Sequence, residues 1–110
     1  MNPVEYLLSV VAEEAGEVVK AACKVLRYGW KGNRSVEGAT NQQDLIDEYN
    51  DLLGSVEYLE EVAETQYGID LLGLRSRKAI NAKKAKIYRT SKNALKAGTL
   101  DSPLPPPCKD

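Results

Sequence analysis

The sequence contains no histidine, and only two of its 110 residues are cysteine. Because histidine is absent, the commonest general base and the commonest nitrogen ligand of transition metals are excluded. A metal ion in this chain would be held mainly by oxygen atoms, which favours Mg²⁺, Mn²⁺ or Ca²⁺ over a zinc site. Cys23 and Cys108 do not indicate a disulfide framework, and a reduced cytoplasmic setting is expected.

Long apolar runs and a large net charge are also missing. No stretch approaches the roughly 20 apolar residues that span a bilayer, and no signal-peptide pattern is visible, so no membrane partner is expected. The net charge is -1, which gives no overall field favouring nucleic acid, and no nucleic acid polymer is expected as a partner. The charge is segregated, however, since nine basic residues and no acidic residue lie between Arg75 and Lys96.

Apolar residues recur at helical spacing in two long segments and more thinly in a third. The first helix is expected over 3–28, with Asn2 as N-cap and Gly29 as its end. The second is expected over about 42–64 and the third over about 73–97, with a loop over 29–43 and a short apolar connection over 69–74. No strand pattern occurs, so the sequence predicts an all-α fold.

The first two helices are expected to form an antiparallel hairpin, and the third to add a thin apolar face containing Ile80, Ile87 and Leu95. Three such helices cannot close a good core alone, which favours a four-helix-bundle-type oligomer, a homodimer or a homotetramer. One domain is expected over 1–98. The proline-rich residues 99–110 are expected to form an extended or disordered tail.

Two acidic clusters share one spacing. With each residue placed about 100° further around its helix, Glu14 and Glu17 fall about 60° and 120° to one side of an apolar stripe. Glu48 and Asp51 fall at about the same angles on the same side of the next stripe, whereas Glu13 points more nearly outward. In an antiparallel hairpin the four carboxylates would meet and repel each other unless hard divalent cations neutralise them. The alternative is ordinary surface charge.

A lysine lies on the apolar face of the third predicted helix. Lys84 shares that face with Ile80 and Ile87, and Lys83 lies beside it. A lysine at such a position is either a snorkelling stem or a cation that meets an anionic ligand. Acidic metal ligands opposite basic residues would suit a nucleoside triphosphate, because metals bridge phosphate oxygens and lysine neutralises the remaining charge.

Residues 13–29, Asn41 with residues 45–53, and residues 82–87 together resemble the MazG-type all-α nucleotide pyrophosphohydrolases, in particular small MazG-like proteins common in phages. The similarity extends over about residues 7–98. It implies hydrolysis of nucleoside triphosphates to the monophosphate and pyrophosphate, by a metal-activated water that attacks the α-phosphorus. It also implies that the Mg²⁺ ligands, with Mn²⁺ as a substitute, are Glu14, Glu17, Glu48 and Asp51.

The remaining candidates surround this acidic set. Glu13 is expected to lie just outside the metal ligands. Candidate contacts to the substrate phosphates or base are Lys24, Arg27, Trp30, Asn41, Lys83 and Lys84. Nucleotide-pool control or sanitation, in a host cytoplasm if the chain is phage-encoded, would be the role. Two alternatives stay open: an all-α dUTPase-type hydrolase, and a non-catalytic helical interaction protein.

Overall fold

The computed structural model describes residues 1–32, 40–71 and 75–108 and shows three helices there: α1 (Pro3–Tyr28), α2 (Asn41–Tyr67) and α3 (Arg77–Ala97). No strand occurs in these ranges, so the all-α prediction is confirmed. The first helix has its expected bounds, whereas α2 is longer at both ends and α3 begins at Arg77 rather than near 73. Parts of the expected loop and connection, 33–39 and 72–74, lie outside the described residues. No helix in the described ranges is long and apolar enough to cross a membrane.

Local side-chain chemistry sets the start of each helix. Asn2 and Glu5 form a reciprocal capping box, in which the Glu5 N–H donates to Asn2 Oδ1 at 2.8 Å and the Asn2 N–H donates to Glu5 Oε1 at 2.9 Å. Thr40 Oγ1 accepts from the Gln43 N–H at 3.1 Å at the start of α2. The same device recurs at α3, which Ser76 caps. Each cap satisfies a helix donor that has no partner within its helix.

A glycine follows the last residue of each helix, as the sequence predicts for Gly29 after α1. Gly68 and Gly98 adopt left-handed backbone conformations, with φ of 65° and 81°. Gly29 has φ of 84°. An L-residue with a side chain rarely occupies this region, so glycine at these positions turns the chain out of the helix without strain.

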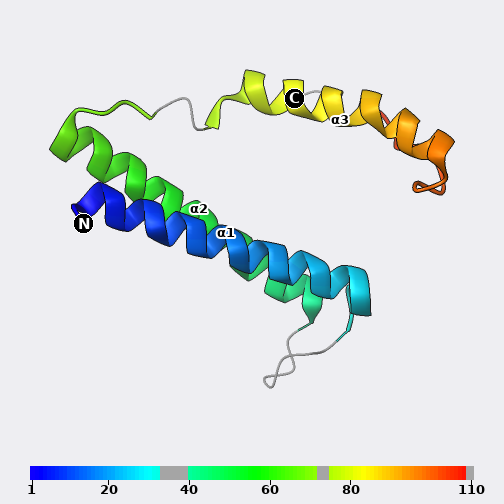
Figure 1. Cartoon of the computed structure of the whole chain (residues 1–110), viewed down its shortest axis with the longest axis horizontal. Helices are drawn as coiled ribbons and strands as arrows, with labels where there is room; N and C mark the ends of the chain where they lie inside the picture. The colour runs from blue at the N-terminus through cyan, green and yellow to red at the C-terminus, as the bar shows by residue number, and fades with distance from the viewer. Residues whose placement is uncertain (33–39, 72–74, 109–110) are drawn as a thin grey trace. The chain divides into compact units, whose positions relative to one another are not determined.

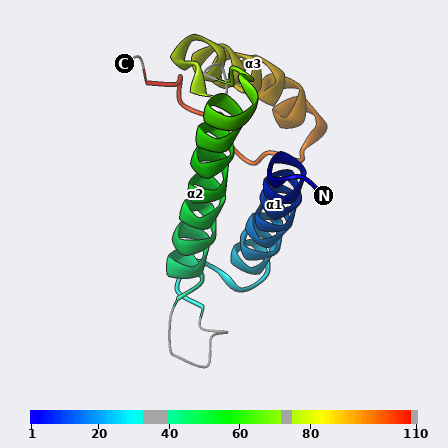
Figure 2. The same ribbon diagram turned by 90° about the vertical axis from the view of Figure 1, so that its left-hand side faces the viewer.

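α1 and α2 lie side by side and run in opposite directions, as Figures 1 and 2 both show. Their interface is narrow. The buried apolar side chains of the described residues are Leu7, Ala21, Leu59 and Ala63. Leu7 and Ala21 are fourteen residues apart, so they lie within about 40° of one line along α1. The predicted hairpin is therefore present, with small and medium side chains along its seam.

The apolar arc of each hairpin helix is wider than the strip that its partner covers. On α1, Leu8, Val19 and Leu26 lie about 100–120° from Leu7 and are 51%, 62% and 86% exposed. On α2, Ile46 and Tyr49 are similarly exposed. On both helices the exposed residues are displaced from the contact line in the same rotational sense. In an antiparallel pair this displacement places them on the same side, so these residues form one face of the hairpin. We call these five residues the apolar face.

The contacts divide the chain into two compact units, Met1–Leu71 and Leu72–Asp110. The first is the α1–α2 hairpin. The second contains α3 and the described part of the proline-rich segment, which reverses direction after Gly98. The N–H groups of Thr99 and Leu100 both donate to the Ala94 carbonyl, at 3.0 and 3.2 Å. No α3 residue is buried, in keeping with its thin apolar face.

Candidate metal centre

Three carboxylates from the two hairpin helices converge on one point. Glu14 on α1 and Glu48 and Asp51 on α2 each offer one oxygen atom, and these atoms all lie within 4.8 Å of one another. Glu14 and Glu48 are half-buried and Asp51 is exposed. The cluster therefore joins residues that are more than 30 positions apart in the sequence, at the edge of the hairpin seam.

The position of Glu14 differs from the predicted one. Glu14 lies seven residues from both Leu7 and Ala21, so it falls on the contact line of α1 and not about 60° to its side. Glu48 likewise lies within about 20° of the line that passes through buried Leu59. The difference arises because α2 covers only the edge of the α1 apolar arc that is nearest the acidic residues. Both carboxylates are consequently more enclosed than the sequence pattern indicates.

Enclosure and crowding raise the pKa of both half-buried carboxyl groups. For Glu14, partial desolvation raises the pKa most, followed by the charges of Asp51, Glu13, Glu48 and Glu17. For Glu48, partial desolvation is again the largest cause, followed by Glu17, Asp51, Asp44 and Asp47. Each group thus has its strongest charged neighbour on the opposite helix, Asp51 for Glu14 and Glu17 for Glu48. Two acidic pairs, Glu14 with Asp51 and Glu17 with Glu48, therefore face each other across the α1–α2 interface.

Glu17 belongs to this electrostatic group but stands outside the three converging oxygens. Its Oε1 lies 3.8 Å from Lys20 Nζ, an i, i+3 ion pair on the surface of α1. Glu13 is exposed, and its charge raises the pKa of Glu14. The predicted set of four is therefore brought together as three close carboxylates with a fourth beside them, and Glu13 lies outside, as its outward direction on the helix predicts.

Two acidic residues that the sequence pattern did not single out also act on the cluster. Asp44 and Asp47 both raise the pKa of Glu48. Asp44 lies four residues before Glu48, so the two share one side of α2, and this spacing is the signal that would have identified it. Glu17, Asp44 and Asp51 all lie on the side of the seam opposite to the apolar face. These acidic residues and the apolar face therefore lie on opposite sides of the hairpin seam.

The loop after α1 is fastened to the start of α2 by Asn41. This side chain is fully buried. Its Nδ2 donates to the Gly29 carbonyl at 3.0 Å, and its backbone N–H donates to the Gly32 carbonyl at 2.9 Å. Asn41 therefore has no exposed surface for a ligand in this conformation, and a contact from it to a substrate phosphate or base stays a prediction.

The start of α2 is closed to anions by the same contacts. The Gln42 N–H donates to the Trp30 carbonyl at 2.9 Å, and Gln43 is bonded to the Thr40 cap. The first donors of α2 thus have protein partners. The Trp30 ring remains 55% exposed, so its backbone is held while its ring stays accessible for stacking.

The other predicted substrate contacts are exposed or lie in the second unit. Lys24 follows Glu17 by seven residues and so shares its side of α1, about 10 Å further along the axis. The Arg27 guanidinium lies over the Tyr28 ring at 5.9 Å. Lys83 is exposed and Lys84 half-buried on α3, which belongs to the second unit, and their roles stay predictions.

The donor set suits a hard divalent cation. All three close donors are carboxylate oxygens, and in an octahedral Mg²⁺ shell adjacent oxygens are about 3 Å apart and opposite ones about 4 Å. The observed limit of 4.8 Å is slightly wider. Small side-chain rotations would close the set, and a bound cation would offset the repulsion that raises the two pKa values. The residues therefore fit Mg²⁺ or Mn²⁺.

Comparison with known proteins gives no relative: no family model, no curated protein and no solved structure matches this chain.

Proposed function

We propose that this chain is a Mg²⁺-dependent nucleoside triphosphate pyrophosphohydrolase, which converts (deoxy)nucleoside triphosphates to the monophosphate and pyrophosphate. The observation that carries the proposal is the convergence of Glu14, Glu48 and Asp51 across the hairpin seam. Like charges at this separation are stabilised by a cation, and phosphoryl chemistry is the commonest use of a carboxylate-held Mg²⁺. The sequence resemblance to MazG-like proteins supplies the reaction.

The residues have distinct roles in this proposal. Glu14, Glu48 and Asp51 would hold the ion, and Glu17, which forms an ion pair with Lys20, would be the fourth ligand. The ion would supply charge neutralisation at the phosphates and activation of a water. Glu13 lies beside this set and can accept a proton or orient a water. Lys24 and Arg27, with Lys83 and Lys84, are the candidate cations for the phosphates, and Trp30 for the base.

An oligomer is part of the proposal. The hairpin exposes the apolar face on the side of the seam opposite to Glu17 and Asp51, and few of the described side chains are buried. A homodimer or homotetramer of four-helix-bundle type would cover that face and leave the acidic side open to substrate. The protein would act on the nucleotide pool of a cytoplasm.

The test is pyrophosphate release from the common and modified nucleoside triphosphates, with and without Mg²⁺. Glu48→Gln removes one ligand charge without changing the length of the side chain, and we expect it to abolish metal binding in calorimetry and to lower turnover by at least 10²-fold, since metal-assisted water activation is lost. Glu64→Gln is the matched control, because Glu64 is exposed on the same helix and lies outside the cluster. Its activity should equal that of the unsubstituted protein.

The outcomes separate the alternatives. Dominant activity on dUTP would assign the chain to a dUTPase-type hydrolase with the same acidic helices. Absence of both Mg²⁺ binding and turnover in the unsubstituted protein would make the acids surface charge and the chain a helical interaction protein.

A further inference from the structure

The two compact units differ sharply in charge. Nine of the fifteen basic residues lie between Arg75 and Lys96, a stretch without Asp or Glu, whereas the acidic residues are concentrated in 1–71. The balanced net charge of the whole chain, which gave no field favouring nucleic acid, is therefore the sum of an acidic unit and a basic unit. Electrostatic interactions between exposed charges are screened beyond about 10 Å at moderate salt. A ligand close to the basic unit therefore meets the charge of that unit and not the net charge of the chain.

The basic residues of α3 are gathered along one side of the helix. Lys78, Arg89 and Lys96 lie within about 20° of one line, and Lys86 and Lys92 flank that line by about 60°. All five side chains are exposed. No carboxylate of the described chain forms a salt bridge with any of them. We call these five residues the basic strip; it extends about 27 Å along the helix axis.

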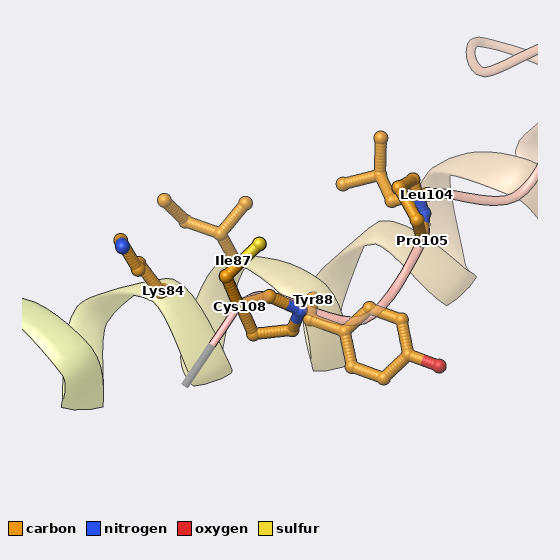
Figure 3. A pocket seen from close by; sticks show the side chains of 7 residues that line it. Lys84, Ile87, Tyr88, Leu104, Pro105 and Cys108 are labelled. Carbon is orange, nitrogen blue, oxygen red and sulfur yellow. The ribbon is translucent and has the colours of Figure 1, made fainter. Parts of the chain in front are cut away.

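The proline-rich segment lies along the opposite side of α3. After the reversal at Gly98, the chain returns along the helix, and a cavity of about 300 Å³ lies between the two (Figure 3). Its lining from α3 consists of Lys84, Ile87 and Tyr88, and its lining from the returning segment includes Leu104, Pro105 and Cys108. The apolar side of α3 is thus partly covered within the chain, with Ile80 and Ile87 still 37% and 48% exposed. The basic strip lies on the far side, where Lys92 Nζ is 5.3 Å from the centre of the Tyr88 ring.

We propose that the basic strip of α3 binds the phosphate backbone of double-stranded nucleic acid. A duplex presents about one negative charge per 1.7 Å of axis, and its major groove, about 12 Å wide, admits an α-helix. A strip about 27 Å long matches such a continuous array and exceeds what a single nucleotide needs. Because lysine and arginine contact phosphates without reading bases, the binding is independent of sequence.

The narrow, partly covered apolar side of α3 favours a duplex over a membrane surface. A basic amphipathic helix binds a bilayer by inserting its apolar side between the lipids while its cations meet anionic headgroups. In this unit that side is narrow, contains Lys84 beside Ile87, and has Leu104 and Pro105 across the cavity from them. A duplex requires only the charged side, where all five residues of the basic strip are exposed.

The experiment measures binding of the full chain to a fluorescein-labelled 24-base-pair DNA duplex by anisotropy, between 50 and 200 mM salt. With about four phosphate contacts, affinity should fall about 10²-fold over this range. Arg89→Gln with Lys96→Gln removes two charges from the basic strip and should weaken binding roughly tenfold at the lower salt concentration. Lys83→Gln with Lys84→Gln removes the same charge from the other side of α3 and should change it much less.

Circular dichroism establishes that both double variants keep their helices, and Lys78→Gln with Lys86→Gln provides a second pair from the strip. Absence of duplex binding at 50 mM salt overturns the proposal. Equal losses in the strip variants and in the Lys83, Lys84 variant also overturn it, because the effect would then follow net charge alone. Tighter binding to vesicles of anionic lipid than to the duplex would assign the strip to a membrane surface instead. None of these outcomes depends on hydrolytic activity, which Glu48→Gln removes separately.

Discussion

Glu14 and Asp51 approach each other from opposite helices of the hairpin, with a pair of carboxylate oxygens within 4.8 Å. After partial desolvation, the charge of Asp51 is the largest cause of the raised pKa of Glu14. Two like charges at this distance cost free energy in the metal-free protein. The same two charges attract a divalent cation, so one arrangement lowers the stability of the free protein and provides affinity for the ion.

Asp51→Asn is therefore expected to have effects of opposite sign in the absence and presence of Mg²⁺. In EDTA the substitution removes repulsion, and the melting temperature should rise or stay level. In excess Mg²⁺ the unsubstituted protein should gain stability, about 2.7 kcal/mol when the free ion is at a hundred times its Kd, and Asp51→Asn should lose most of that gain. Thermal unfolding with and without Mg²⁺ measures both effects.

Glu64→Gln is the control for this prediction, since it also removes one negative charge from α2 but lies away from the cluster. It should leave the Mg²⁺-dependent gain unchanged. A gain that is equally large in Asp51→Asn would show that the ion binds elsewhere.

The stability of the metal-free protein should increase as the pH falls from neutral. The pKa values of Glu14 and Glu48 are raised above 4.5 in the folded state. As the pH falls through these raised values toward 4.5, the folded state takes up protons that the unfolded state does not yet bind, so folding becomes more favourable. Above the raised values both groups are ionised in both states, and the full repulsion remains.

Melting temperatures in EDTA between pH 7.5 and 4.5 measure this dependence. The double variant Glu14→Gln with Glu48→Gln should be distinctly less sensitive to pH over the same range, because its two central groups cannot titrate. An identical pH dependence in the double variant would show that other groups control it.

The helices and their ends follow from local rules that the sequence displays. The periodicity of apolar residues predicts three helices. Asn2 begins α1 because it caps the first N–H donors, and Gly29 ends α1 because it turns the chain there. The shared i, i+3 spacing of Glu14 with Glu17 and of Glu48 with Asp51 predicts that acidic residues meet in an antiparallel pair. Three of the four carboxylates do so.

The position of Glu14 could not be predicted from the sequence, because it depends on which section of the wide apolar arc of α1 is covered by α2. Viewed down the axis of α1, the apolar arc extends from the direction of Val10 to that of Leu26. The periodicity does not predict that α2 packs along Leu7 and Ala21 and leaves Leu26 exposed. This choice moves Glu14 onto the contact line. The burial of Asn41 is similarly a tertiary property, because it requires the carbonyl of Gly29 to meet its side chain.

Gly32 is expected to tolerate no side chain. A Cβ atom at this position would lie 2.6 Å from the Tyr28 carbonyl oxygen and 2.8 Å from Asn41 Nδ2. Gly32→Ala therefore has to displace the backbone or break the contact that holds the loop to α2, and should destabilise the protein by about 1–3 kcal/mol. Chemical denaturation monitored by circular dichroism measures the loss.

Gly54→Ala is the matched control for Gly32→Ala. Gly54 lies in the interior of α2, and no atom outside its own helical backbone lies within 4 Å of a Cβ there. Alanine is the better helix former, so this variant should be more stable by about 0.5–1 kcal/mol. Gly16 in α1 has the same open surroundings, which excludes close packing within the described chain as the reason for that glycine. Loss of stability in Gly54→Ala would indicate that a second copy approaches α2 at this point.

The apolar face should be the contact between copies of the chain. Val19 is 62% exposed and lies on that face of α1 with Leu8 and Leu26. Val19→Asp places a charge there, and burying an unpaired charge costs several kcal/mol, so the variant should shift from dimer or tetramer to monomer in size-exclusion chromatography with light scattering. Ser9→Asp adds the same charge to an exposed position of α1 outside the apolar face and should leave the mass unchanged. An unsubstituted protein that is monomeric at 100 µM, or a Val19→Asp variant that keeps the oligomeric mass, would contradict the assignment of this face.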